Sequence, residues 1–170
     1  MALEERLAAG SDRRAEDQLI DLMNRYEQPF RSFLLVLLRD QELALDCAQD
    51  TYIRAYENLR KGRPVNAQWL YKVARNRAMD EFRRRRRVHA GMEALEERPG
   101  DTPDVSIETE TVRRVLDLLS PEDREVLYLF VFDRFKTAEI ATMLGIGAGA
   151  VRTRLYRARE RFRLLYGDAL

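Results

Sequence analysis

The C-terminal part of the chain carries arginine, threonine and tyrosine residues spaced to lie on one side of a helix. A guanidinium group can bond two acceptors of guanine at once, and threonine or tyrosine suits a phosphate or a thymine methyl group. Gly145 precedes them and permits the left-handed backbone of a tight turn between two helices. The pattern predicts a helix-turn-helix that reads duplex DNA through Arg152, Thr153, Tyr156 and Arg157.

Small and apolar residues allow the two helices of this motif to pack against each other. Ala141 stands where two helices must approach closely, and Ile146, Val151 and Leu155 are spaced to pack the second helix on the first. A plain helical hairpin with a solvated charged face is the alternative. The coincidence of a turn glycine, a close-packing alanine and an arginine-rich second helix favours DNA binding.

A second set of polar residues lies in the N-terminal half, on a helix predicted over residues 41–59. Its buried stripe consists of small and aromatic residues, so Asp46, Gln49, Asp50 and Glu57 fall elsewhere on its surface.

The next predicted helix begins after the breaker segment 61–64 and runs to residue 87, with Asn66 as its N-cap. Lys72 and Asn76 lie on its polar side. Five consecutive arginines follow, which turn through about 500° of helix and therefore cannot share one solvated face. They are Arg83, Arg84, Arg85, Arg86 and Arg87. We interpret them as phosphate-binding. A lone tryptophan, Trp69, fits a core position better than a stacking platform.

The remaining elements are also helical, which places the chain in the all-α class. A long amphipathic helix is predicted over residues 15–39, a helix near residues 109–119, and another after the Ser120-Pro121 start signal. Between them the segment 91–108 is rich in proline, glycine and acid, and we interpret it as a flexible linker. The sequence thus predicts two small helical domains, residues 1–90 and 109–170.

Charge and composition limit the classes of function that this chain can have. The net charge is only +1, yet residues 59–90 carry 11 basic and 2 acidic side chains, and residues 127–170 carry 8 and 4. Two basic blocks alternate with acidic ones, as expected for two separate surfaces that bind a polyanion. One cysteine and one histidine leave no ligand set for a metal site, and no cofactor is expected. No secretion signal or membrane-spanning run is visible, so we expect a cytoplasmic protein. No constellation of catalytic residues is present, so we expect no enzyme activity.

Three motifs in this order resemble the extracytoplasmic-function (ECF) sigma factors. The stretch 46–56 resembles their polymerase-docking helix, the stretch 69–80 with the following arginines resembles their promoter-melting and minus-ten segment, and residues 119–127 lead into the helix-turn-helix as in their region 4. The motifs cover most of the chain, and their conjunction is more specific than any one of them.

The resemblance implies a role for each set of residues. Asp46, Gln49, Asp50 and Arg54 would bind core RNA polymerase, and the minus-ten promoter element would meet Lys72, Asn76 and the arginine run Arg83 to Arg87. Asn76 would recognise a base of the melted strand. The helix-turn-helix would bind the minus-thirty-five element, and an anti-sigma factor would be a further partner.

Two other classes of protein compete with this interpretation. One is a helix-turn-helix regulator that binds duplex DNA without polymerase and uses its N-terminal half for sensing or dimerisation. Such a regulator has no need of a docking helix followed by a basic single-strand track. The other is a protein-binding adaptor, which the two basic blocks disfavour.

Overall fold

The computed structural model describes residues 2–88 and 107–168, and all regular structure within these ranges is helical. In chain order the helices are α1 (Ala2–Leu38), α2 (Gln41–Arg60), α3 (Ala67–Val88), α4 (Ile107–Asp117), α5 (Pro121–Val131), α6 (Thr137–Leu144) and α7 (Ala148–Asp168). The predicted all-α class is confirmed. The predicted linker falls almost entirely outside the described residues.

Local sequence signals explain where several helices begin. In three cases a side-chain oxygen before the helix accepts a hydrogen bond from a backbone N–H three residues later. The pairs are Asp40 with Leu43 at 2.9 Å, Asn66 with Trp69 at 2.9 Å, and Ser120 with Asp123 at 3.2 Å. The N-caps predicted at Asn66 and Ser120 are therefore confirmed, with Pro121 in the first turn.

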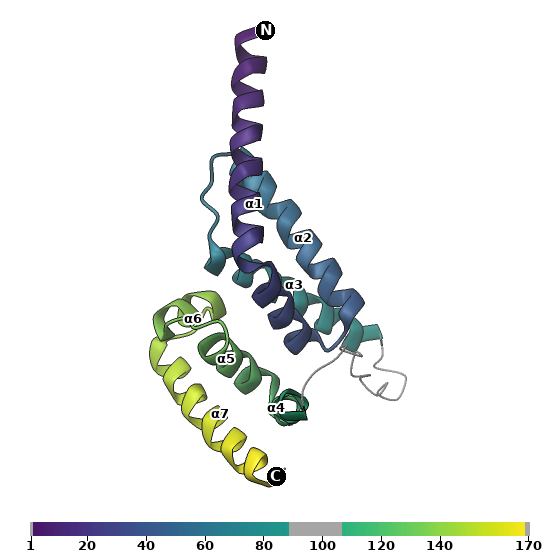
Figure 1. Ribbon diagram of the computed structural model, residues 1–170, viewed down its shortest axis with the longest axis vertical. Coiled ribbons are helices and arrows are strands. Elements are labelled where there is room, and N and C mark those ends of the chain that lie inside the picture. Colours follow the sequence, from purple (N-terminus) through teal and green to yellow (C-terminus); the bar gives the residue numbers. More distant parts are fainter. Residues whose placement is uncertain (1, 89–106, 169–170) are drawn as a thin grey trace.

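Helix α1 is longer than the sequence predicts, because it begins at Ala2 and not near residue 15. Its first turns project beyond the other helices (Figure 1), so no apolar stripe marks them. Alanine, leucine, glutamate and arginine predominate there, and these residues favour helix without tertiary support. Asp12 also accepts a hydrogen bond from Arg60 of α2 at 2.6 Å. The helix continues through Pro29.

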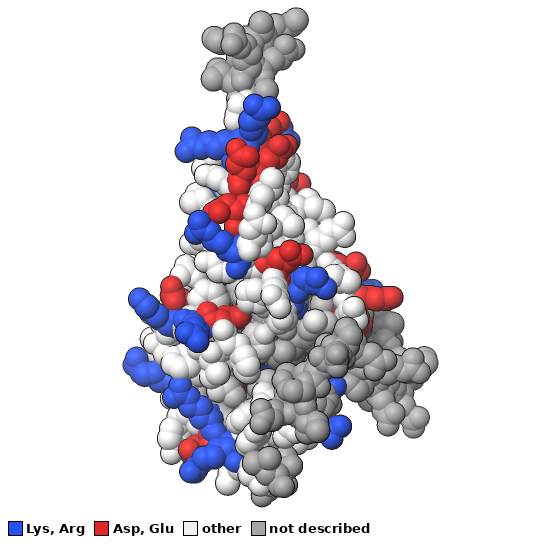
Figure 2. Space-filling view, in the orientation of Figure 1, with Lys and Arg blue, Asp and Glu red and all other residues white. Residues whose placement is uncertain are grey.

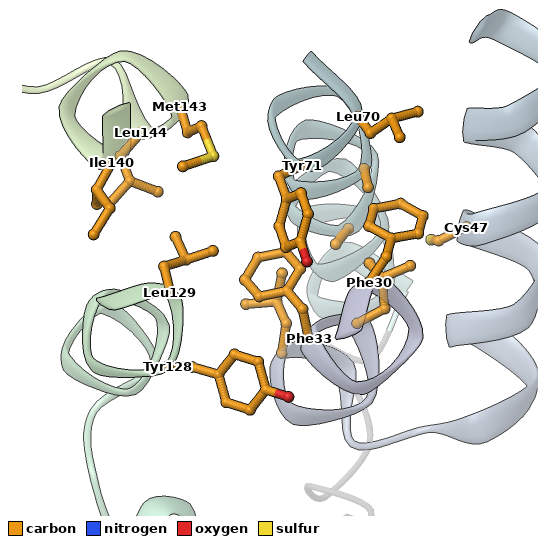
Figure 3. Packing of buried hydrophobic residues seen from close by; sticks show 14 of the residues in the cluster. Phe30, Phe33, Cys47, Leu70, Tyr71, Tyr128, Leu129, Ile140, Met143 and Leu144 are labelled. Carbon is orange, nitrogen blue, oxygen red and sulfur yellow. The ribbon is translucent and has the colours of Figure 1, made fainter. Parts of the chain in front are cut away.

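The helices form two groups that pack on each other, α1–α3 as the first group and α4–α7 as the second group (Figure 1). The two groups are in direct contact, since α1 contacts α5 and α3 contacts α6. One apolar core runs through both groups (Figure 3). The ring of Tyr71 occupies its centre, 5.0 Å from the ring centroids of both Phe33 and Phe135. A smaller core joins α4, α5 and α7.

Candidate nucleic-acid interface

Helices α6 and α7 form the predicted helix-turn-helix. Gly145 adopts a φ of 65° at the end of α6, and the N–H of Ile146 donates to the carbonyl oxygen of Ala141 at 3.1 Å. An L side chain rarely adopts this conformation, so the glycine permits the tight turn. Val151 and Leu155 of α7 are buried in the core that α6 helps to form. These contacts fix the direction of α7 relative to α6.

All four residues predicted to read the upstream duplex are exposed on α7. Tyr156 is 70% exposed, which is unusual for a tyrosine without a partner surface. The hydroxyl of Thr153 donates to the carbonyl oxygen of Gly149 at 3.1 Å, which leaves its lone pairs free to accept a bond. Arginine side chains follow α7 along the edge of the molecule in Figure 2. The helix thus offers donors and cations to a groove of DNA.

Helix α3 presents the predicted minus-ten residues on its solvent side. Lys72 and Asn76 are exposed one turn apart, as the spacing of four predicts. Trp69 is half-buried and packs against the shared core, so the interpretation as a core residue is correct. The α3 surface therefore offers one cation and one amide side by side.

The first two arginines of the run are exposed and form ion pairs within α3. Arg83 bonds Asp80 at 2.9 Å, and Arg84 bonds Glu81 at 2.5 Å, although Glu81 itself is only 4% exposed. Pairs at an exposed guanidinium are weak, so a phosphate can displace them. The side chains of Arg85, Arg86 and Arg87 lie outside the described residues.

The four residues predicted to bind polymerase share one side of α2. Asp46, Gln49 and Arg54 are exposed, and Asp50 is half-buried. Asp50 lies 3.1 Å from the guanidinium of Arg77 in α3 and 3.8 Å from that of Arg54. Helical spacing does not predict the Arg77 contact, which joins the predicted docking helix to the predicted minus-ten helix.

A groove of about 530 Å³ between α1 and α2 adjoins these residues. It is mainly apolar and includes two side chains that periodicity had left without a role, Leu45 at 44% exposed and Ile53 at 52% exposed. Its other apolar members are Leu19, Met23, Ala48, Tyr52 and Tyr56. Burial raises the pKa of Tyr52 to about 12, so its hydroxyl stays neutral. Exposed apolar residues beside an acidic face are typical of a protein-binding surface. The sequence does contain one indication of this groove, because the apolar residues Leu45 and Ile53 lie off the buried stripe of α2.

In the part of the chain that the structure describes, no group of three or more potential metal ligands is found. No helix among the described residues is long and apolar enough to cross a membrane.

Comparison with known proteins identifies the family. The pattern of "Sigma-70 region 2" matches residues 22–88, and that of "Sigma-70, region 4" matches residues 109–162. The ECF RNA polymerase sigma factor EcfG of Rhodopseudomonas palustris is 31% identical over 81% of this chain and 80% of its own. The ECF sigma factor SigL of Mycobacterium tuberculosis is 34% identical over 78% of this chain and 79% of its own.

Solved structures show the same fold. The sigma factor RpoE of Bartonella quintana, in complex with the anti-sigma factor NepR, superposes with a TM-score of 0.75 at 24% identity over 88% of this chain and 94% of its own. CnrH in complex with the cytosolic domain of CnrY gives a TM-score of 0.67 at 24% identity over 95% and 96%. The two regions and their order define a polymerase specificity subunit. The chain belongs to the sigma-70 family, as an RNA polymerase sigma factor of the ECF type.

Proposed function

We propose that three exposed helical faces divide the work of promoter recognition. Helix α2 binds core RNA polymerase through Asp46, Gln49, Asp50 and Arg54, and α3 binds the melted minus-ten strand. Helix α7 binds the minus-thirty-five duplex. The observation that carries this proposal is that most of the described polar residues of the three motifs are exposed, while the apolar stripes of the same helices are buried.

On α3 we propose that Asn76 selects a base and that the cations hold the backbone. The amide of Asn76 can donate and accept, which base recognition requires, whereas the ammonium of Lys72 is a point charge suited to phosphate. The arginines Arg83, Arg84, Arg85, Arg86 and Arg87 continue this phosphate track. On α7, Arg152 and Arg157 supply bidentate donors, with Thr153 and Tyr156 as additional contacts.

We propose that the groove beside α2 takes part in polymerase binding. Ile53 is more than half exposed, so Ile53→Ser removes apolar contact area without opening a cavity in the core. The melting temperature of the Ile53→Ser variant should stay near that of the parent chain, while its affinity for core enzyme should fall about tenfold or more. Ile20→Ser is the matched control, since Ile20 is 55% exposed and does not line the groove.

We propose that residues 1–90 carry the polymerase and minus-ten surfaces, that residues 91–108 are a linker, and that residues 109–170 carry the minus-thirty-five surface. Catalysis belongs to the polymerase, and we assign the chain no enzyme activity of its own. Polymerase and chromosome both lie in the cytoplasm, where we place this protein. Run-off transcription with purified core enzyme over genomic DNA tests the function as a whole. Tight, sequence-specific footprints from the isolated protein would instead support the regulator that acts without polymerase.

We also propose an anti-sigma factor as a partner. The sigma factor RpoE was crystallised with the anti-sigma factor NepR, and CnrH was solved in complex with the cytosolic domain of CnrY. A protein that covers the α1–α2 groove would compete with core polymerase for it. Titration of core enzyme into a complex with the purified product of a neighbouring gene tests this competition directly. Simultaneous binding of both proteins would contradict the shared site.

A further inference from the structure

Three carboxylates of the second group meet one stripe of α3. Gln68, Tyr71 and Arg75 are spaced by three and four residues, so they lie above one another on the helix side that faces α5 and α6. Each meets a different acid. Gln68 donates to Glu139 at 2.7 Å and Arg75 bonds Glu125 at 2.6 Å, while the Tyr71 hydroxyl is the polar group that lowers the pKa of Asp133.

The two outer carboxylates are well satisfied. Glu125 is only 3% exposed but has the guanidinium of Arg75 as a counter-ion. Glu139 accepts from Gln68 and also from the backbone N–H of Lys136, the residue before α6, at 2.7 Å. The Gln68–Glu139 and Arg75–Glu125 contacts therefore hold the two groups together.

Asp133, in the middle, differs from its neighbours. It lies in the segment after α5, and its Oδ2 atom is buried without a hydrogen-bond partner. The groups that act on it are the Tyr71 hydroxyl from α3 and the Tyr128 hydroxyl from α5, and Ser32 of α1 hydrogen-bonds Tyr128 in turn. Among the described residues Asp133 forms no ion pair. Asp133 as a whole is half-buried, but a carboxylate with one buried, unpartnered oxygen is costly when ionised and acceptable when protonated.

We propose that the three carboxylates form an intramolecular clamp on α3, and that the protonation state of Asp133 controls how readily the clamp opens. Opening separates the second group from the first group. Its relevance to promoter binding rests on the proposed function, because α3 and α7 carry the two DNA surfaces and the closed packing fixes their distance. The opening equilibrium itself is a property of the isolated chain.

The direction of the pH effect follows from the burial of Asp133. Burial raises the pKa of Asp133 to about 7 in the closed form, and the hydrogen bond from Tyr71 opposes this rise. Exposed in the open form, the carboxyl returns to the ordinary aspartate pKa of 3.8. The closed form thus binds more protons between these values, is favoured at low pH, and loses this contribution as the pH rises to about 7. From pH 6 to pH 8 the open-to-closed ratio should rise about tenfold.

Thiol labelling measures this ratio even when the open form is rare. Met143 of α6 is 2% exposed and lies on the side of α6 that faces α3 (Figure 3), so a cysteine there reacts only after opening. Met143→Cys is made together with Cys47→Ala, so that the chain has one thiol. Labelling rates of this chain and of its Asp133→Asn derivative are compared at each pH, which cancels the titration of the thiol itself.

We divide the labelling rate of the Met143→Cys chain by that of its Asp133→Asn derivative. This ratio should rise about tenfold from pH 6 to pH 8. Asp21→Asn is the matched control, because Asp21 is exposed and pairs with Arg25 on α1. The labelling rate of the Met143→Cys chain divided by that of its Asp21→Asn derivative should not change with pH. Tyr71→Phe removes the hydrogen bond that lowers the Asp133 pKa, so the rise should move to higher pH. A ratio independent of pH for the Asp133 comparison overturns the proposal.

The native thiol distinguishes opening from unfolding. Cys47 is 2% exposed within the first group, and burial raises the pKa of its thiol. In the natural chain it should react far more slowly than the Met143→Cys probe, because it is exposed only when the first group unfolds. Equal rates would show that both thiols report unfolding and would also overturn the clamp. Neither measurement uses polymerase or DNA, so failure of the proposed function would appear separately in the transcription assay.

Discussion

At the scale of single residues, the arginines of α7 differ in what they contact. Arg159 lies over the ring of Phe130 at 4.7 Å, and Arg163 bonds Glu160 of the same helix at 2.9 Å. Arg152 stands at the exposed start of the helix, where recognition helices meet base edges. Equal charges on one helix are therefore expected to contribute unequally to DNA binding.

Arg152→Ala should weaken binding of the holoenzyme to its upstream element by about 1–3 kcal/mol and relax the preference at one base pair. Arg163→Ala is the matched control, because it removes the same charge from an exposed surface pair farther along α7. Binding to a library of upstream variants measures both. An equal loss for both arginines across all sequences would mean that Arg152 contacts phosphate and not a base.

Asn76→Ala should impair the choice of one base in the melted strand and leave the affinity for upstream duplex unchanged. Lys72→Ala, one turn away on the same face, should weaken binding to every sequence and lower its salt dependence. Forked templates that vary in the minus-ten element separate the two effects. If Asn76→Ala transcribed all variants in the original proportions, Asn76 would not select the base.

At the scale of helices, the sequence predicted helix boundaries better than it predicted which helices pack against each other. Ser120, Asn66 and Gly145 act on backbone groups within a few residues, so their roles are visible locally. Arg124 and Glu125 follow Glu122 and Asp123 in a segment that is typical of a solvated first turn, yet both are buried. Periodicity assigns a side chain to a face of its helix and contains no information about which distant helix covers that face.

The polar side of α2 offers a direct test of polymerase docking. Asp50→Arg should weaken association with core enzyme, because it reverses the charge of the proposed interface and adds repulsion from Arg77 and Arg54. Asp21→Arg makes the same change at an exposed ion pair on α1. Both should retain the helical content of the parent by circular dichroism. Unchanged association of the Asp50 variant in a pull-down would remove α2 from the interface.

At the scale of the whole molecule, polar contacts also join the two groups. The guanidinium of Arg124 donates to the carbonyl oxygens of Leu116 and Leu119 at the end of α4, and to that of Val36 in α1 at 3.3 Å. Asp117 of α4 also lies 3.4 Å from Arg39, which follows α1. These contacts specify one arrangement of the groups, because each needs a particular partner geometry.

Arg75→Ala should destabilise the chain by about 3 kcal/mol, since it leaves Glu125 buried without a counter-ion. Arg25→Ala, at an exposed pair, should cost less than about 1 kcal/mol. Burial already raises the pKa of Glu125, and loss of Arg75 raises it further, so the destabilisation should be smaller at low pH, where Glu125 is protonated. Urea denaturation at two pH values measures this, and Glu125→Gln added to Arg75→Ala should recover part of the loss.

The shared core also has a consequence for protein synthesis. Phe33 and Tyr71 are covered by Tyr128 of α5 and by Phe135 of the segment that follows it, which the ribosome adds only after α3 is complete. At typical translation rates of about 5–20 residues per second, the aromatic side chains of the first three helices remain exposed for several seconds until the residues that cover them are synthesised. During this interval the nascent chain presents an apolar surface to chaperones and to other nascent chains. Conditions that slow translation between α3 and α5 should therefore lower the yield of native protein before any step of transcription is reached.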